Sequence, residues 1–198
     1  MGLILEMSDL YSEVDPWGYR KSNRHAVTMG VCQSFWDKEG LFREFGCGEG
    51  YLLKMAMDWL KPRPLGIGGY ELDPVAVERA RVLLDAKWVY EWDLRLSVPS
   101  HVIPSTMILL SDVLPYIPDH AECVVEQSFD QLHGGGYLVL TSWTDNQKYG
   151  PLFGPVPDGG KVVCEMEWKG LLTNKDDQEY ESTASYRVIR KVHDRRDT

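Results

Sequence analysis

The feature that most constrains the fold is a regular alternation of short apolar runs with amphipathic stretches between residues 41 and 141. The apolar runs have the composition of strands and span 41–45, 65–70, 87–92, 106–110 and 137–141. The stretches between them place apolar residues at helical spacing, over 51–60, over 74–84 and from Asp119 to the glycines at 134–136. Strands that alternate with helices predict an α/β fold, with a doubly wound, mostly parallel sheet covered on both faces.

The sequence changes character on both sides of this alternating part. Before it, residues 23–36 have the spacing of a helix, and after it residues 150–160 are rich in proline and glycine and predict a long loop. Residues 167–173 and 180–191 then have the pattern of two strands around a polar turn. We expect this pair to be antiparallel and to close the sheet, and we expect the 198 residues to form a single domain.

Composition and charge limit the class of protein and its partners. Apolar residues make up 43% of the chain and charged residues 26%, as in ordinary globular proteins. The 30 Asp and Glu against 21 Lys and Arg give a net charge of −9, which disfavours a broad nucleic-acid surface. No apolar run approaches the roughly 18 residues that span a membrane, and the start lacks the basic and apolar regions of a signal peptide. We therefore expect a cytoplasmic protein without membrane contact.

The cysteines and histidines do not indicate a metal site. Cys32, Cys47, Cys123 and Cys164 are widely scattered, and no two of them have C-x-x-C spacing. The histidines have no companion ligands at metal spacing. We therefore expect no metal, and thiols that stay reduced, as in a cytosol.

The most informative motif is the stretch Glu44–Gly50, between the first predicted strand and the helix after it. Its glycines at 46, 48 and 50 permit backbone dihedral angles that other residues resist, and they let a ligand approach the main chain closely. The helix that follows presents free N–H groups and a positive dipole end. The dinucleotide fingerprint G-x-G-x-x-G does not fit, because Tyr51 stands where its third glycine belongs.

A G-x-G-x-G run behind an acidic residue resembles motif I of the class I S-adenosylmethionine-dependent methyltransferases. The later elements agree with that family in order and spacing, including the glycines at 134–136 before the fifth strand. The resemblance implies a Rossmann-like methyltransferase fold with a seven-stranded sheet, and S-adenosylmethionine as the cofactor. It also divides the chain into an N-terminal cap segment (1–40), a cofactor-binding core (41–141) and an acceptor-side loop with the closing strand pair (142–198).

The same resemblance assigns roles to residues at the ends of the strands. It implies that Glu71 accepts the ribose hydroxyls and Asp93 the adenine amino group, with Trp92 and Leu94 as walls for the adenine. Asp73 is better explained as the cap of the helix that follows it. The predicted cofactor-binding residues are Glu44, Gly46, Cys47, Gly48, Gly50, Glu71, Leu72, Trp92, Asp93, Leu94, Ser111, Trp17 and Tyr19.

A narrower likeness lies near the N-terminus. The segment 15–19, with Ser22 and a helix after it, resembles the nodulation protein S branch of these enzymes. That branch N-methylates the free amine of a de-N-acetylated chitooligosaccharide, so the resemblance implies a sugar-type acceptor. Trp17 and Tyr19 either close over the sulfonium, since aromatic faces attract cations, or pack as ordinary N-terminal side chains.

Three residues are candidates for catalysis: Asp112, Tyr116 and His25. Asp112 either anchors the methionine ammonium of the cofactor, orients the acceptor or caps a loop. Tyr116 follows the same strand and is a candidate wall or base of the acceptor pocket. His25, together with Arg24, either meets a carboxylate of the cofactor or substrate or belongs to a solvated helix face.

The resemblance therefore implies methyl transfer to an amine or hydroxyl of a small molecule. Two alternatives stay open. One is nucleic-acid methylation, against which stand the charge of −9 and the absence of a contiguous Asn/Asp-Pro-Pro-Tyr/Phe motif. The other is a module that binds S-adenosylmethionine without transferase activity. The sequence names neither the acceptor nor the oligomeric state.

Overall fold

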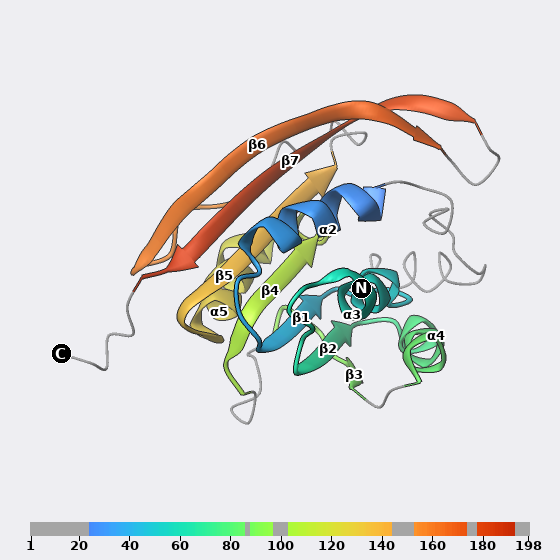
Figure 1. The fold of residues 1–198 in the computed structure, drawn as a ribbon, viewed down its shortest axis with the longest axis horizontal. Helices are drawn as coiled ribbons and strands as arrows, with labels where there is room; N and C mark the ends of the chain where they lie inside the picture. The colour runs from blue at the N-terminus through green and yellow to red at the C-terminus, as the bar shows by residue number, and fades with distance from the viewer. Residues whose placement is uncertain (1–23, 86–87, 97–102, 144–152, 174–177, 193–198) are drawn as a thin grey trace.

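The computed structural model describes residues 24–85, 88–96, 103–143, 153–173 and 178–192 (Figure 1). The predicted positions Trp17 and Tyr19 lie outside this part of the chain. The helices are α2 (Arg24–Phe35), α3 (Tyr51–Trp59), α4 (Pro74–Leu84) and α5 (Ala121–Asp130), with short 3-10 turns η1 (Leu114–Tyr116) and η2 (Pro118–His120). The strands are β1 (Leu41–Phe45), β2 (Gly66–Glu71), β3 (Val89–Glu91), β4 (Ser105–Ser111), β5 (Leu132–Trp143), β6 (Gly160–Thr173) and β7 (Glu179–Lys191).

The seven strands form one sheet in the order β3-β2-β1-β4-β5-β7-β6. Strands β1 to β5 pair in parallel, whereas β7 runs antiparallel between β5 and β6. The predicted fold class, a mostly parallel seven-stranded sheet closed by an antiparallel pair, is confirmed. Because the first strands are parallel, their carboxyl ends meet at one edge of the sheet, where open α/β sheets bind ligands.

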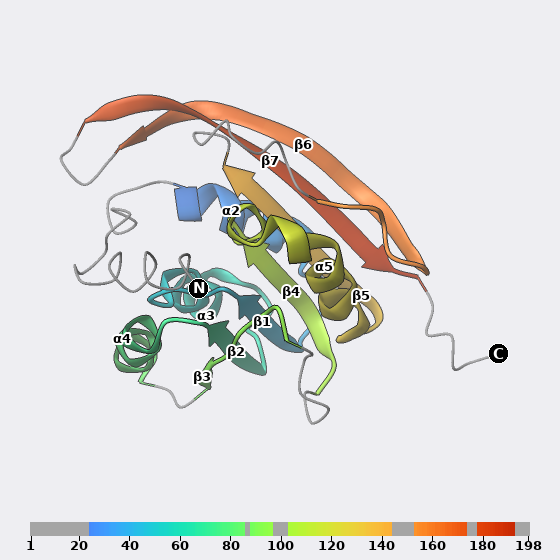
Figure 2. The ribbon, with the colours of Figure 1, turned by 180° about the vertical axis from the view of Figure 1, so that it is seen from behind.

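The alternation of side chains along the strands builds a core on each face of the sheet. Met107 and Leu109 of β4 face the core that α2, α3 and α4 cover. Ile108 and Leu110, the residues between and after them, face the core that α5 covers (Figure 2). The prediction that this strand is covered on both faces is confirmed. None of the helices in the described segments is long and apolar enough to cross a membrane.

Helix α4 begins and ends where the sequence predicts. The side chain of Asp73 accepts hydrogen bonds from the backbone N–H groups of Val75, at 2.8 Å, and Ala76, at 3.0 Å. Pro74 occupies the first helical position, where its missing N–H costs nothing. The predicted role of Asp73 as a helix cap is therefore confirmed.

Strand β5 begins earlier than predicted. The helix before it ends at Asp130, so the glycines at 134–136 lie inside the strand and not in a turn before it. The register between β4 and β5 shifts at this point, and Gly135 has a φ of 81°. A Cβ on Gly136 would lie 3.0 Å from the carbonyl oxygen of Thr106. The glycines therefore form an irregularity that presses closely against β4.

Two other strands differ in length from the prediction. Strand β3 covers only Val89–Glu91 of the predicted 87–92. Strand β6 begins at Gly160, well before the predicted residue 167. Side chains from 161 to 165 alternate between exposed and half-buried. Because the apolar Val163 is one of the exposed ones, the sequence does not show the alternation of polar and apolar residues that is typical of a strand.

A lysine from the last strand closes the end of α5. Lys191 is buried, and its Nζ donates to the carbonyl oxygens of Leu132 at 2.9 Å, Asp130 at 3.3 Å and Phe129 at 3.5 Å. A helix leaves its last carbonyls without partners inside the helix, and a cation there also interacts favourably with the helix dipole. Lys191 thus ties the closing strand pair to α5.

Candidate functional site at the carboxyl edge of the sheet

The glycine turn lies at the carboxyl end of β1 and has a backbone that other residues resist. Gly46, Gly48 and Gly50 have φ values of 75°, 50° and 82°. The N–H groups of Gly46 and Cys47 both donate to the carbonyl oxygen of Tyr70, at 2.7 and 3.1 Å. A Cβ on Gly46 would lie 2.2 Å from Cγ2 of Val113. The turn, which we call the cradle, is therefore main chain packed closely between Tyr70 of β2 and Val113, which follows β4.

Helix α3 starts directly after this turn without a capping side chain of its own. Its N-cap is Gly50, which offers no side-chain oxygen. Glu44, two residues before the turn, hydrogen-bonds the backbone N–H of Leu53 in the first turn of the helix instead. A side-chain oxygen is favoured there, because it satisfies an N–H that has no partner inside the helix. Glu44 therefore connects the end of β1 to the first turn of α3.

Glu71, at the end of β2, is bound to the cradle by backbone donors. Its Oε2 accepts the N–H of Gly48 at 2.8 Å. Its Oε1 accepts the N–H of Leu72 at 2.8 Å and that of Asp73 at 3.0 Å. Burial raises the pKa of Glu71, and the three N–H groups oppose that shift. Both oxygens face donors, so the ionised carboxylate is the form that fits.

Glu44 and Glu71 form a buried pair of acids with different protonation. Glu44 is 2% exposed and Glu71 is 4% exposed. Burial, and then the charge of Glu71, raises the pKa of Glu44 well above its usual range. Oε2 of Glu44 has no hydrogen-bond partner within the described segments. Of two like charges in one buried site, one is neutralised, and Glu44 is the one that holds the proton. Burial also raises the pKa of the neighbouring Cys47, which stays a neutral thiol.

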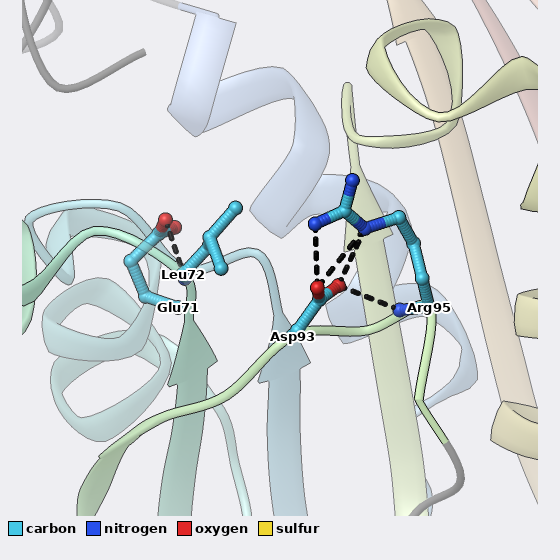
Figure 3. Close-up of polar contacts among 4 residues, drawn as sticks. All are labelled: Glu71, Leu72, Asp93 and Arg95. Atoms are coloured by element: carbon cyan, nitrogen blue, oxygen red, sulfur yellow. Dashed lines mark hydrogen bonds and ion pairs between the residues drawn. The ribbon is translucent and has the colours of Figure 1, made fainter. Parts of the chain in front are cut away.

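Asp93 follows β3 and is bound by an arginine two residues later (Figure 3). Its Oδ1 accepts the backbone N–H of Arg95 at 3.0 Å and Nε at 2.8 Å. Its Oδ2 lies 3.0 Å from the same Nε and 2.5 Å from Nη2. The hydrogen bonds from Arg95 lower the pKa of Asp93, so this carboxylate is charged and paired.

The predicted walls of the adenine site lie around these acids. Figure 3 shows Leu72 between Glu71 and the Asp93–Arg95 pair, at the ends of neighbouring strands. Trp92 and Leu94 pack against the core on the α5 side of the sheet. The indole Nε1 of Trp92 is buried and has no hydrogen-bond partner among the described residues.

The ends of β4 and β5 carry a second group of polar and aromatic side chains. Asp112 has a φ of 58°, which non-glycine residues seldom adopt. Its Oδ2 accepts from Nη2 of Arg24 at 3.2 Å, and its Oδ1 accepts the N–H of Trp143 at 3.2 Å. The guanidinium of Arg24 lies 4.4 Å from the centre of the Trp143 ring. Ser111, beside Asp112, shares a hydrogen bond with the hydroxyl of Thr141 at 3.1 Å.

The remaining catalytic candidates do not titrate near neutral pH. Burial, and then the charge of Arg24, lowers the pKa of His25 to about 3, so this imidazole is uncharged and does not meet a carboxylate as a cation. The alternative that His25 and Arg24 belong to a solvated helix face is wrong, because His25 is buried and the Arg24 side chain is 12% exposed. Burial, and then Asp112, raises the pKa of Tyr116 to about 12, so this phenol keeps its proton.

The predicted residues apart from Trp17, Tyr19 and His25 therefore lie in two groups along one edge. The first holds Glu44, Gly46, Cys47, Gly48, Gly50, Glu71, Leu72, Trp92, Asp93 and Leu94, and the second holds Ser111, Asp112 and Tyr116. Sequence reasoning missed Arg95, which stands two residues after an aspartate. An aspartate side chain often accepts a hydrogen bond from the backbone N–H of the residue two positions later, so this spacing could have indicated the contact.

In the described part, no group of three or more His, Cys, Asp or Glu side chains is placed to hold a metal ion.

No protein-family model and no curated protein matches the sequence. Solved structures do match the fold. The N-methyltransferase NodS from Bradyrhizobium japonicum WM9, in complex with S-adenosyl-L-homocysteine, aligns with a TM-score of 0.73 and 14% identity over 96% of this chain and 99% of that one. A putative RNA methyltransferase, PH1948 from Pyrococcus horikoshii, aligns with a TM-score of 0.62 and 14% identity, over 98% of this chain and 99% of that one. TrmN from Thermus thermophilus aligns with a TM-score of 0.62 and 15% identity, over 86% of this chain and 53% of that one.

These identities are low, so the likeness establishes the fold. The seven-stranded sheet and its closing antiparallel pair agree with it. This chain has the Rossmann-like fold of the class I S-adenosylmethionine-dependent methyltransferases.

Proposed function

We propose that this protein transfers the methyl group of S-adenosylmethionine to an amine of a small molecule. The observation that carries the proposal is the glycine turn at the carboxyl edge, where Gly48, at a positive φ, donates its N–H to the buried, ionised Glu71. A glycine whose main chain has no side chain of its own, beside a fixed acid, suits a ligand with a ribose next to a charged chain.

The residues of the first group fit this cofactor. The Glu71 carboxylate accepts three backbone N–H groups, which leaves about one of its four lone-pair positions for a ribose hydroxyl. Leu72 offers an apolar contact between Glu71 and Asp93 (Figure 3). S-adenosylmethionine supplies a methyl group already activated by the sulfonium charge, so the protein has to place the acceptor in line and exclude water.

The second group favours an amine over a hydroxyl as the acceptor. A hydroxyl needs a base that is poised near neutral pH, whereas a neutral amine attacks without one. His25 has a pKa of about 3 and Tyr116 of about 12, so neither is such a base. The Asp112 carboxylate is engaged by Arg24 and the Trp143 N–H. Asp112 and Tyr116 then orient the amine rather than activate it.

The experiment that tests the proposal starts with calorimetric titration of the purified protein with S-adenosylhomocysteine, with NAD as the control ligand. We expect one-to-one binding of the first alone, and loss of this binding in Gly48→Val, which puts a branched side chain into the turn. S-adenosylmethionine is then incubated with small amines, including an amino sugar, and with the matching alcohols. Formation of S-adenosylhomocysteine with amines but not with alcohols supports the proposal, and the reverse result overturns the choice of acceptor.

The same experiments, with a nucleic-acid binding assay, also test the two alternatives left open by the sequence, a non-catalytic binding module and a nucleic-acid methyltransferase. Binding of S-adenosylhomocysteine without turnover of any acceptor would indicate a module that binds the cofactor only. Of the structural neighbours, one is named a putative RNA methyltransferase and another is named TrmN. Tight, salt-sensitive retention of RNA or DNA on a filter would favour a nucleic-acid substrate despite the net charge of −9.

A further inference from the structure

A cavity of about 580 Å³ lies between the start of α3 and one face of α4, which are neighbouring helices (Figure 1). We call it the α4 groove. Its apolar walls include Tyr51, Val75, Val82 and Leu83. Val75 and Val82 are 46% and 83% exposed, and because they stand seven positions apart they lie two turns apart on the same face of the helix. Exposed apolar side chains that gather in a groove are typical of a binding surface.

The charged side chains that line the α4 groove are paired within the protein. Glu49 of the glycine turn forms an ion pair with Arg79 of α4 at 2.7 Å. Glu78 pairs with Arg81 one turn further along the same helix. The surface that the groove offers to a partner is therefore mainly apolar, and it suits the apolar face of a helix.

Residues 3–14 of this chain, which the proposed function does not use, have the complementary pattern. If they are helical, their apolar side chains form one stripe about 120° wide. The stripe consists of Leu3, Ile4, Met7, Leu10, Tyr11 and Val14. The polar side chains all lie outside it, and these are Glu6, Ser8, Asp9, Ser12 and Glu13. Leu5 is the one apolar residue outside the stripe, so the pattern is that of an amphipathic helix.

The chain also keeps these residues within reach of the groove. Residues 3–14 lie outside the described part, which begins at Arg24. The residues between them, 15–23, span up to about 30 Å when extended. His25, at the start of α2, has its ring centre 6.4 Å from that of Tyr51, which lines the groove. A helix over 3–14 is about 18 Å long, close to the length of about 16 Å of α4.

We propose that residues 3–14 form an amphipathic helix whose apolar stripe binds in the α4 groove of the same molecule. The inference does not rest on the proposed cofactor, because the groove, the pattern and the connecting residues are properties of the chain alone. Since the segment is tethered, its binding is intramolecular, and short flexible linkers give effective concentrations in about the millimolar range. Glu49 belongs to the glycine turn, so this docking joins the segment to the edge that holds the candidate site.

Hydrogen exchange of the full chain, without ligand and read by mass spectrometry on peptides that cover residues 3–14, tests the inference. A lone helix of this length is marginal in water, so slow exchange requires docking. We expect exchange at least about tenfold slower than in a free peptide of the same sequence. Met7→Glu, in the middle of the stripe, and Val82→Glu, in the groove, should each restore fast exchange, because each puts a charge into the apolar contact.

Two matched controls make the same kind of change elsewhere. Ser12→Glu adds a charge to the polar side of the segment. Val163→Glu replaces another exposed valine, on β6 at the opposite edge of the sheet from β3. We expect both to keep the slow exchange of residues 3–14.

Three results would overturn the inference. One is exchange of residues 3–14 in wild type at the rate of the free peptide. Another is slow exchange that Met7→Glu or Val82→Glu leaves unchanged, which would mean that the segment binds elsewhere. The third is slow exchange that is lost on about tenfold dilution, which would place the segment in the groove of a second copy. If Val82→Glu does not fold, Met7→Glu still decides whether the stripe makes the contact. Failure to bind S-adenosylhomocysteine would contradict the proposed function and leave this result standing.

Discussion

Replacing Glu44 with glutamine tests whether the acid beneath the glycine turn carries a proton in the folded protein. Glu44 is 2% exposed, and Oε2 has no partner among the described residues. Burial and the charge of Glu71 raise its pKa well above the usual range. The groups packed around it from other elements are Glu71 of β2, Cys47 of the turn and Cys32 of α2. None of these is a cation that would stabilise an ionised Glu44.

The sign of the effect on stability follows from the direction of the shift. An acid with a raised folded pKa is protonated when folded and ionised when unfolded, so folding takes up a proton. Stability is then highest below the unfolded pKa of about 4.3 and falls as pH rises toward the folded pKa. The slope is at most about 1.4 kcal/mol per pH unit, so the loss between about pH 5 and 7 reaches up to about 2.7 kcal/mol. Glu44→Gln has no proton to take up and lacks this loss.

Urea unfolding of wild type and variant at about pH 5, 6 and 7 measures the difference. We expect the unfolding free energy of Glu44→Gln to gain on that of wild type at each step up in pH. Glu126→Gln, which removes an exposed acid from α5, is the control for the same change in net charge. A difference between Glu44→Gln and wild type that stays constant over this pH range would refute the protonated Glu44.

Three further substitutions test the cradle and the closing strands. Gly46→Ala puts a Cβ 2.2 Å from Cγ2 of Val113 at a φ of 75°, so calorimetry should show at least about tenfold weaker S-adenosylhomocysteine binding. Adding Val113→Ala should recover part of it, and no recovery would point to backbone strain alone. Glu71→Ala should weaken the same binding by about 1.5–3 kcal/mol, and wild-type affinity would contradict the ribose site. Lys191→Met removes this donor from two carbonyls at the end of α5 and from that of Leu132 in β5, and should lower the unfolding free energy by about 1–3 kcal/mol, seen in thermal melts, with binding unchanged.

The fold could be predicted where single residues have one strong conformational preference. Asp73 and Pro74 mark the start of α4 to the residue, because a cap acceptor and a fixed φ act within one turn. The starts of β5 and β6 could not be predicted in this way. Glycines at 134–136 and an exposed Val163 are compatible with loops, and only the neighbouring strands decide that these residues extend.

The candidate site could be predicted as a set of residues but not as a set of bonds. The ends of parallel strands meet at one edge, so Glu71, Asp93 and Asp112 could be placed there from the order of the elements. Their partners depend on the packed structure. Arg24 reaches Asp112 across 88 positions of the chain, and the proton on Glu44 depends on burial that only the folded core creates.

Among the acids at the carboxyl edge, Glu71 forms no ion pair with a described basic side chain. The paired acids there are Glu49 with Arg79, Asp93 with Arg95, and Asp112 with Arg24. Glu44 is held neutral by burial, whereas Glu71 is held ionised by backbone N–H groups. In the proposed reaction the cofactor arrives with a positive sulfonium and leaves as a neutral thioether, so its attraction to Glu71 decreases when the methyl group is transferred. If Glu71 binds the ribose as proposed, the same acid also favours exchange of the product for fresh cofactor, and this difference in affinity requires no change in the conformation of the protein.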